Sequence, residues 1–172
     1  LLLGEMQSDQ GSAEIPAGLA VAHVKQETPG TDRAAIEYVL DGDTELRSIE
    51  QKLLAAEEAD DGMLQAELHL QIANIDAYTA PARAARILQG LGFKAEQLNL
   101  PVNEFSGGWR MRLNLAQALI CRSDMMLLDE PTNHLDLDAV IWLETWLKDY
   151  KGTLLLISHD RDFLDAVVSH ML

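Results

Sequence analysis

The sequence predicts an α/β fold in which a parallel sheet core carries an inserted α-helical hairpin. The first observation is the order of patterns after Pro101, which runs helix, strand, helix, strand. The second is the shortness of the apolar runs "DMMLLD" and "GTLLLIS", which is typical of buried parallel strands. The third is a long helical stretch, residues 32–93, that precedes this alternation. Alternating strands and helices favour a parallel sheet because a parallel pair needs a crossover connection.

The length and composition are those of a globular protein. The chain has 172 residues, of which 48% are hydrophobic, enough for one or two small domains with a core. No apolar run approaches the roughly 18 residues of a membrane-spanning helix. The start at Leu1 shows neither the basic segment nor the cleavage site of a signal peptide. Because "LLLGEM" has the pattern of a helix interior, we expect the sequence to be a fragment of a longer chain.

The net charge limits the kinds of binding partner that suit this protein, and the cysteine content indicates the redox compartment in which it folds. The formal net charge is −15, from 28 acidic and 13 basic residues. This balance argues against broad wrapping of nucleic acid, which needs many cations to neutralise phosphates, but it allows one local basic patch. The single cysteine, Cys121, excludes an internal disulfide and agrees with a reducing, cytoplasmic compartment.

The first 30 residues predict one helix end and one strand. Residues 1–6 have the pattern of a last helical turn, and turn-forming residues follow as far as Gly18. Residues 19–26 alternate apolar and other side chains, which predicts a strand that ends at Gln26. The segment "ETPG" then ends this strand.

Residues 31–100 predict a helical subdomain whose centre, about residues 44–80, forms an antiparallel hairpin. Two apolar stripes with helical spacing lie on either side of the polar turn "EEADDG". The stripes are Leu46, Ile49 and Leu53 before the turn, and Leu64, Leu68, Ile72 and Ile75 after it. Each arm is about 15 residues, or roughly 22 Å, long. The hairpin is either a structural subdomain with solvated acidic faces or a protruding arm that contacts a partner.

Residues 101–172 predict two helices and two buried strands. The helices are "GGWRMRLNLAQALIC" and "LDAVIWLETWLKDY", and the strands are "DMMLLD" and "GTLLLIS". Trp142 and Trp146 are four residues apart, with Leu143 and Leu147 beside them. This spacing predicts a core-facing stripe without a chemical role.

Polar side chains follow both of these strands. Asp129 and Glu130 end the first strand, and "SHD", with His159, follows the second. In parallel sheets, ligands bind beyond the carboxyl ends of the strands, so these groups are expected on one rim. One carboxylate there could hold Mg²⁺ and its neighbour could accept a proton from water. The alternative is structural: "DE" would cap a helix and His159 would be a polar loop residue.

A second candidate site is the segment "FSGGW". Ser106 is placed to cap the helix that follows, and Gly107 and Gly108 leave backbone N–H groups open at its N-terminus. Such a terminus can bind an anion. The alternative is a plain helix start. Gln26, at a strand end, is uninformative by itself.

Five segments occur in a fixed order: Gln26, "FSGGW", "MMLLDEP", "TNHLD" and "LLLISHD". In order and spacing they resemble the Q-loop, signature, Walker B strand, D-loop and switch histidine of an ATP-binding cassette. The resemblance covers residues 26–160. "DEPTNHLD" and a helical arm between Q-loop and signature are similar to the ABC-F proteins, and above all to their first cassette. Those proteins are soluble, carry two cassettes in one chain and include translation factors that act on the ribosome.

The resemblance implies ATP and Mg²⁺ as ligands and a role for each residue of the rim. Asp129 would help to hold Mg²⁺, and Glu130 would be the general base for the attacking water. His159 would contact the γ-phosphate. Gln26 would contact the metal or the water.

The resemblance also implies an interface with the second cassette of the same chain. Ser106, Gly107 and Gly108 would face ATP held by the opposite cassette, and Asp136 would lie at the cassette–cassette interface. Trp109 stands where the signature usually has a glutamine, so the side-chain contacts at this position are open.

The resemblance divides the chain into three parts. Residues 1–30 would belong to the ATPase core and end at the Q-loop, residues 31–100 would form the helical subdomain, and residues 101–172 would complete the core. No G-x-x-x-x-G-K-[ST] loop occurs in the sequence, so we expect the fragment alone to bind and hydrolyse ATP poorly. The implied partner is the ribosome (rRNA, ribosomal protein or tRNA), without membrane insertion. The acidic arm region could meet RNA only at a few points such as Arg47, Lys52 and Arg83.

Three alternatives remain open from the sequence. An ATPase subunit of a membrane transporter would share all five motifs, but usually lacks this arm and "TNHLD". A chromosome-associated ATPase head would carry a coiled-coil insertion of many heptads, whereas the stripes here cover about four helical turns each. A non-catalytic interaction module would use the arm alone, although the acids and histidine of the rim are intact.

Overall fold

The computed structural model describes residues 16, 18–25 and 30–170. Its centre is a three-stranded parallel sheet in the order β1-β2-β3, which confirms the predicted α/β class. The strands are β1 (Val21–His23), β2 (Met125–Asp129) and β3 (Thr153–Ile157). The helical turn predicted at residues 1–6 and the predicted site residue Gln26 lie outside the described residues.

The three strands differ in length and burial. β1 has three residues and pairs with the first three residues of β2, so the strand predicted at residues 19–26 is shorter than expected. β2 is central, and Met126 and Leu128 are buried. The sequence predicts a buried β3, and this is wrong: Leu155 is 39% and Ile157 57% exposed. The reason is its position at the edge of the sheet, where one face has no covering layer among the described residues.

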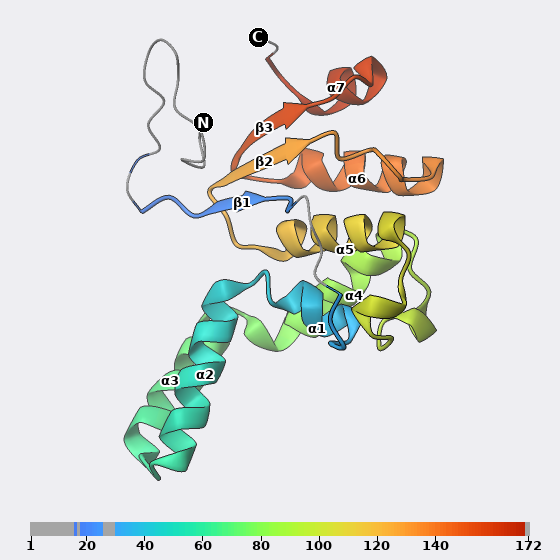
Figure 1. The fold of residues 1–172 in the computed structure, drawn as a ribbon. Helices are drawn as coiled ribbons and strands as arrows, with labels where there is room; N and C mark the ends of the chain where they lie inside the picture. The colour runs from blue at the N-terminus through green and yellow to red at the C-terminus, as the bar shows by residue number, and fades with distance from the viewer. Residues whose placement is uncertain (1–15, 17, 26–29, 171–172) are drawn as a thin grey trace, which may run out of the picture.

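The helices pack beside the sheet and then extend away from it (Figure 1). α5 lies between β1 and α1, and α4 contacts both α5 and α6. The helices are α1 (Ala35–Leu40), α2 (Thr44–Glu58), α3 (Gly62–Asn74), α4 (Ala80–Gly90), α5 (Gly107–Ile120), α6 (Leu137–Asp149) and α7 (Arg161–Val167). Three short 3₁₀ helices are η1 (Ala77–Thr79), η2 (Ala95–Gln97) and η3 (Val102–Glu104).

A buried asparagine joins the end of β1 to the helical layer. Asn114 of α5 accepts a hydrogen bond from the Tyr38 hydroxyl at 2.7 Å and donates one to the Lys25 carbonyl at 2.7 Å. Asn114 is 2% exposed, so these bonds offset the cost of burying its amide. The contact holds the chain where it leaves β1, immediately before Gln26.

α2 and α3 form an antiparallel pair that projects from the rest of the molecule (Figure 1). Each helix begins at an aspartate that caps it: Asp43 accepts from the Leu46 N–H, and Asp61 accepts from the Leu64 N–H. The facing sides are apolar, and the residues buried between the helices and at their base include Leu46, Ile49, Ala56, Leu68 and Ile72. This pair, with the turn between its helices, is called the arm below.

The arm is fastened at its base by a buried carboxylate. The Asp43 side chain is fully buried and contacts Arg83 of α4 at 3.2 Å and Arg122 at 3.1 Å. Arg122 also donates a hydrogen bond to the Ile75 carbonyl at the end of α3. Arg122 follows α5 and precedes β2, so both ends of the arm are tied to the segment that leads into the central strand.

A second ion-pair network covers the outer side of this base. Arg47 contacts Glu37 at 2.6 Å, Asp41 at 2.9 Å and Glu50 at 2.7 Å. Arg47 and Arg83 are two of the expected points of RNA contact, and in the structure both are paired with carboxylates.

The contact between α4 and α6 depends on a glycine. A Cβ atom added to Gly90 would lie 2.0 Å from the Trp142 ring. We therefore expect Gly90→Ala to destabilise the chain by about 2 kcal/mol through overpacking, a fall in Tm of roughly 4–8 °C. The control is Gly62→Ala at the start of α3, where an added Cβ meets nothing within 4 Å. Equal Tm values for the two variants would contradict this packing.

Candidate active site

The candidate site is built where β2 ends. Asp129 is the last residue of β2, and the Glu130 N–H donates to the Ile157 carbonyl of β3 at 2.8 Å. Glu130 has φ of +48°, a left-handed conformation that is uncommon for residues other than glycine. The Asn133 N–H closes the turn by donating to the Glu130 carbonyl. Backbone strain of this kind is concentrated at functional sites.

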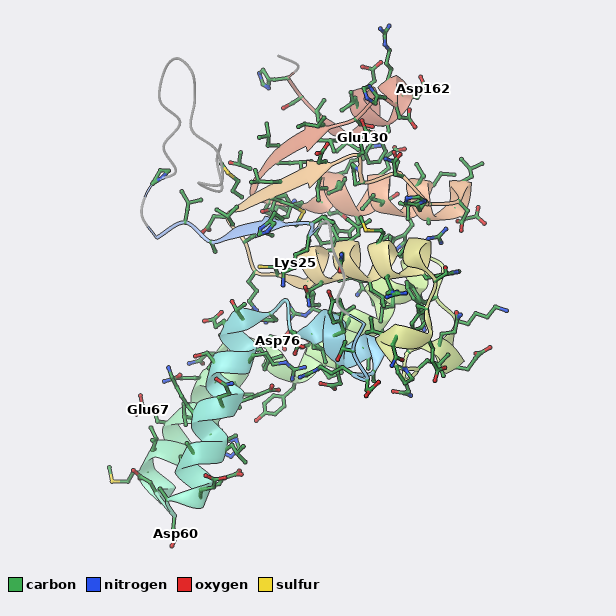
Figure 2. All side chains as sticks on the ribbon, in the orientation of Figure 1. Lys25, Asp60, Glu67, Asp76, Glu130 and Asp162 are labelled. Atoms are coloured by element: carbon green, nitrogen blue, oxygen red, sulfur yellow. The ribbon has the colours of Figure 1, made fainter. Side chains whose placement is uncertain are left out.

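The structure brings Glu130 and His159 together at this rim, and Figure 2 labels Glu130 at the end of β2. His159 Nε2 lies 3.5 Å from Glu130 Oε1. The His159 side chain is 98% exposed and that of Glu130 is 22% exposed. Glu130 Oε1 itself is buried and has no hydrogen-bond partner among the residues that the structure describes. A buried carboxylate oxygen without a donor is costly, so this atom is suited to a donor that arrives with a ligand or a water.

A small cavity of about 120 Å³ adjoins the two carboxylates. Its wall includes Asp129, Glu130, Asn133, His134 and Arg112. The volume is enough for a few water molecules. The site can therefore hold a water beside a carboxylate, which is the arrangement that general-base catalysis requires.

The interpretation of "DE" as a helix cap is wrong. α6 begins after Asp136, whose side chain accepts from the Ala139 N–H at 3.0 Å. Neither Asp129 nor Glu130 takes that place, because the turn that follows them separates both from Leu137, the first residue of α6. The two carboxylates are thus left without a capping function for α6.

The segment 132–136, called the D-loop below after the motif that it resembles, is held by one arginine of α5. Arg112 donates to the His134 carbonyl at 2.8 Å, to Asp136 at 3.0 Å and to the Leu91 carbonyl at 2.9 Å. The Ala139 N–H, and then the Arg112 guanidinium, lower the pKa of the Asp136 carboxyl below its usual value. His134 has φ of +66°, so the D-loop makes a tight turn around these contacts.

The sequence motifs do not include Arg112. The sequence feature that indicates its role is its position three residues after Trp109 in the same helix, because this spacing places both side chains on one face. In the structure the Arg112 guanidinium lies 4.6 Å from the Trp109 ring centre. Trp109 also packs edge-on against Phe93 at 4.8 Å. The tryptophan that replaces the usual glutamine of the signature therefore makes contacts within this chain.

The signature segment begins α5. Ser106 occupies the N-cap position, as predicted, and the Arg110 N–H donates to its carbonyl, the first backbone hydrogen bond of the helix. Within the described residues its side chain makes no capping hydrogen bond. Ser106 and Gly107 are exposed. A Cβ atom on Gly108 would approach His134 at 3.8 Å, so Gly108 lies against the D-loop, whereas a Cβ atom on Gly107 would meet no described residue within 4 Å.

The residues present fit a magnesium ion that is completed by phosphate oxygens. In the part of the chain that the structure describes, no three His, Cys, Asp or Glu side chains form a metal cluster. Mg²⁺ typically needs only one or two carboxylates, with waters and phosphate oxygens as its other ligands. Asp129 is exposed at the rim, and Glu130 Oε1 beside it lacks a donor among the described residues, which agrees with that chemistry.

Comparison with known families decides the identity of this fold. A family model described as "ABC transporter" matches residues 1–133. The chain belongs to the ATP-binding cassette family. The rim of β2 and the segments around it are therefore parts of a cassette.

Relatives place this cassette in the ABC-F branch. "Probable ATP-binding protein YheS" of Escherichia coli (strain K12) is 60% identical over all 172 residues. The corresponding protein of Haemophilus influenzae is 57% identical over the same length. "ATP-binding cassette sub-family F member 3" of Rattus norvegicus is 44% identical over 169 residues, or 94% of the chain. The chain spans 27%, 27% and 24% of these three proteins.

Solved structures share the fold. A "putative metal-chelate type ABC transporter" matches with a TM-score of 0.56 at 20% identity, over 96% of the cassette and 58% of that chain. The archaeal ribosome recycling factor aABCE1, in complex with the ribosomal stalk protein aP1, matches with a TM-score of 0.58 at 22% identity, over 94% of the cassette and 26% of that chain. Within the described part of the chain, no helix combines the length and the apolar character needed to cross a bilayer.

Proposed function

We propose that the chain is part of an ATP-binding and ATP-hydrolysing cassette of an ABC-F protein that acts on the ribosome in translation. The observation that carries the ATPase part is the buried Glu130 Oε1, which lies 3.5 Å from His159 and has no hydrogen-bond partner in the described part of the chain. The ribosomal part rests on the resemblance to ABC-F proteins and on the character of the arm.

In the proposed reaction, Glu130 accepts a proton from the water that attacks the terminal phosphate of ATP. His159, exposed beside it, contacts that phosphate and stabilises its charge. Asp129, and Gln26 outside the described residues, would hold Mg²⁺ together with the phosphate oxygens. When bound, Mg²⁺ neutralises charge that develops on the phosphates.

The other face of the cassette is proposed to meet a second cassette of the same protein. Ser106, Gly107 and Gly108 would face ATP held by that cassette, and Asp136 would lie at the interface. The contacts of Arg112 support this arrangement because they join the signature helix to the D-loop. No G-x-x-x-x-G-K-[ST] loop occurs in these 172 residues, so the phosphate cradle would come from residues outside them, and the chain alone would turn over ATP poorly.

The arm has the character of a protein-binding element. Residues 44–80 contain eight acidic and two basic residues. Figure 2 labels three of these acids, with Asp60 at the tip, Glu67 along α3 and Asp76 near the base. Large apolar side chains are exposed on the arm, namely Leu54 at 58%, Met63 at 88% and Leu70 at 65%, and Tyr78 of η1, just beyond it, is 69% exposed. Acids around exposed apolar groups suit a basic protein surface, so we propose a ribosomal protein as the contact of the arm.

The experiment is co-sedimentation of the full-length protein with ribosomes. With Glu130→Gln, which is expected to trap ATP, we expect ATP-dependent binding because the closed cassettes orient the arm. Replacing residues 50–70 with a Gly-Ser turn retains Asp43 and Ile75, through which Arg83 and Arg122 hold the base of the arm. We expect this variant to bind at least about tenfold more weakly.

The two negative outcomes have different meanings. Equal binding with and without the arm would make the arm a structural spacer. No ribosome binding by either form would reject the ribosomal function and favour the alternative, the ATPase subunit of a membrane transporter.

A further inference from the structure

A groove of about 390 Å³ lies between α4, the end of α5 and the C-terminal half of α6. Four basic residues line it: Arg83, Arg86, Arg122 and Lys151. None of its lining residues is acidic. The chain has a net charge of −15 and only 13 basic residues, so the groove gathers almost a third of them. A local concentration of cationic side chains in so acidic a chain favours binding of an anionic ligand.

Two of the four cations are free to meet a ligand. Arg83 and Arg122 both contact Asp43, so their charges are partly balanced. Arg86 and Lys151 are exposed, and neither has a hydrogen-bond or ion-pair partner in the described part of the chain. The four basic side chains of the groove, together with Asp43 behind two of them, carry four positive charges and one negative charge. The excess lies on the solvent side, at Arg86 and Lys151.

The groove also has a fixed aromatic wall. The rings of Trp146 and Tyr150 stack with centres 6.0 Å apart and an interplanar angle of 16°. The Tyr150 hydroxyl donates to the Ser123 carbonyl at 2.9 Å and lies 3.0 Å from the Ser123 hydroxyl. Both rings are only half-buried, so ring surface is open to a ligand. Because Tyr150 is tethered and stacked, this surface is organised before a ligand binds.

We propose that this groove binds a short stretch of single-stranded RNA. Arg86 and Lys151 would contact backbone phosphates, and a base would stack on the Trp146–Tyr150 wall. Cations beside stacking surfaces are the usual means by which proteins hold single strands. An acidic peptide would satisfy the cations but leave the aromatic faces without a planar partner. The volume of about 390 Å³ lies in the range of small-ligand sites and fits about one nucleotide.

The position of the groove connects it to the arm. Arg122, in its wall, also donates to the Ile75 carbonyl at the base of α3. The RNA-binding groove is therefore at the root of the arm, whereas the acidic arm itself is suited to protein. The inference rests on the proposed ribosomal function for the source of the RNA, which would be the ribosome. Binding of free RNA can be measured whether or not the protein acts on ribosomes.

The test is fluorescence anisotropy of a labelled ten-nucleotide oligouridine with the full-length protein at several salt concentrations. We expect Arg86→Gln with Lys151→Gln to weaken binding about tenfold. The slope of log affinity against log salt should become shallower by roughly 1.4, or about 0.7 for each phosphate that the protein no longer neutralises. Trp146→Leu should weaken binding about fivefold or more because a base can no longer stack there.

Two matched controls lie away from the groove. Lys94→Gln removes an exposed lysine, and Tyr78→Leu removes an aromatic ring that is 69% exposed. Both should change RNA affinity by less than about twofold, and circular dichroism of every variant should match the parent. Groove variants that bind RNA as the controls do would overturn the proposal. Competition by oligoglutamate as strong as that by unlabelled RNA would instead assign the groove to an acidic peptide.

The same variants separate this proposal from the ribosomal one. If ribosomes still bind but RNA affinity is unchanged in the groove variants, the groove proposal fails and the ribosomal function stands. If the groove variants lose RNA but the full-length protein never binds ribosomes, the groove stands and the ribosomal function fails.

Discussion

Glu130→Gln is expected to slow ATP hydrolysis at this cassette by a factor on the order of 10² to 10⁴ in the full-length protein, with ATP binding retained. The amide keeps the size of the carboxylate but cannot accept the proton of the attacking water. The buried Oε1 beside His159 is the atom expected to take that proton. Loss of a general base costs a rate factor of this size, while contacts to the nucleotide from other residues remain.

The measurement is single-turnover hydrolysis at this site, together with an equilibrium titration of ATP. The matched control is Glu104→Gln, which removes an exposed carboxylate just before the signature segment. The control should hydrolyse ATP at the parent rate. An unchanged single-turnover rate in Glu130→Gln would show that Glu130 is not the base.

Asp43→Ala is expected to lower the free energy of unfolding of the chain by about 3 kcal/mol, a fall in Tm of roughly 6–12 °C. The Asp43 side chain is fully buried, contacts Arg83 and Arg122, and caps α2 at the Leu46 N–H. Its removal leaves two cations without their acid and a helix start without its acceptor. The arginine side chains are 33% and 30% exposed, so water can partly rehydrate them and the cost stays at the low end for a broken buried ion pair.

The control for Asp43 is the other capping aspartate of the arm. Asp61 accepts from the Leu64 N–H in the same way, but it is exposed and has no arginine partner within the described part of the chain. Asp61→Ala should therefore cost only about 1 kcal/mol, the value of a cap alone. Urea denaturation followed by circular dichroism measures both variants. Equal losses of unfolding free energy in the two variants would mean that the ion pairs of Asp43 with the two arginines do not contribute to stability.

The sequence by itself determined the parts of this protein that depend on local patterns and on strand direction. Short apolar runs between helical stripes were enough for the parallel sheet, because a parallel pair requires a crossover. The same logic placed Glu130 and His159 at one rim, since both follow the carboxyl ends of parallel strands. Asp129 and Glu130 were recognisable because adjacent acids after a buried strand have no folding advantage.

Away from the strand ends, only the tertiary structure decided which polar groups meet. Asp43 and Arg122 are 79 residues apart, and Arg112 reaches the Leu91 carbonyl 21 residues away, so no local periodicity reveals either contact. The exposure of β3 followed from its edge position, which an apolar run cannot specify. Ser106 is the N-cap of α5 as predicted, but the lack of a capping bond from its side chain within the described residues likewise depended on side-chain geometry. A side chain's partner is selected by packing between distant elements, and a one-dimensional pattern records only which faces are apolar.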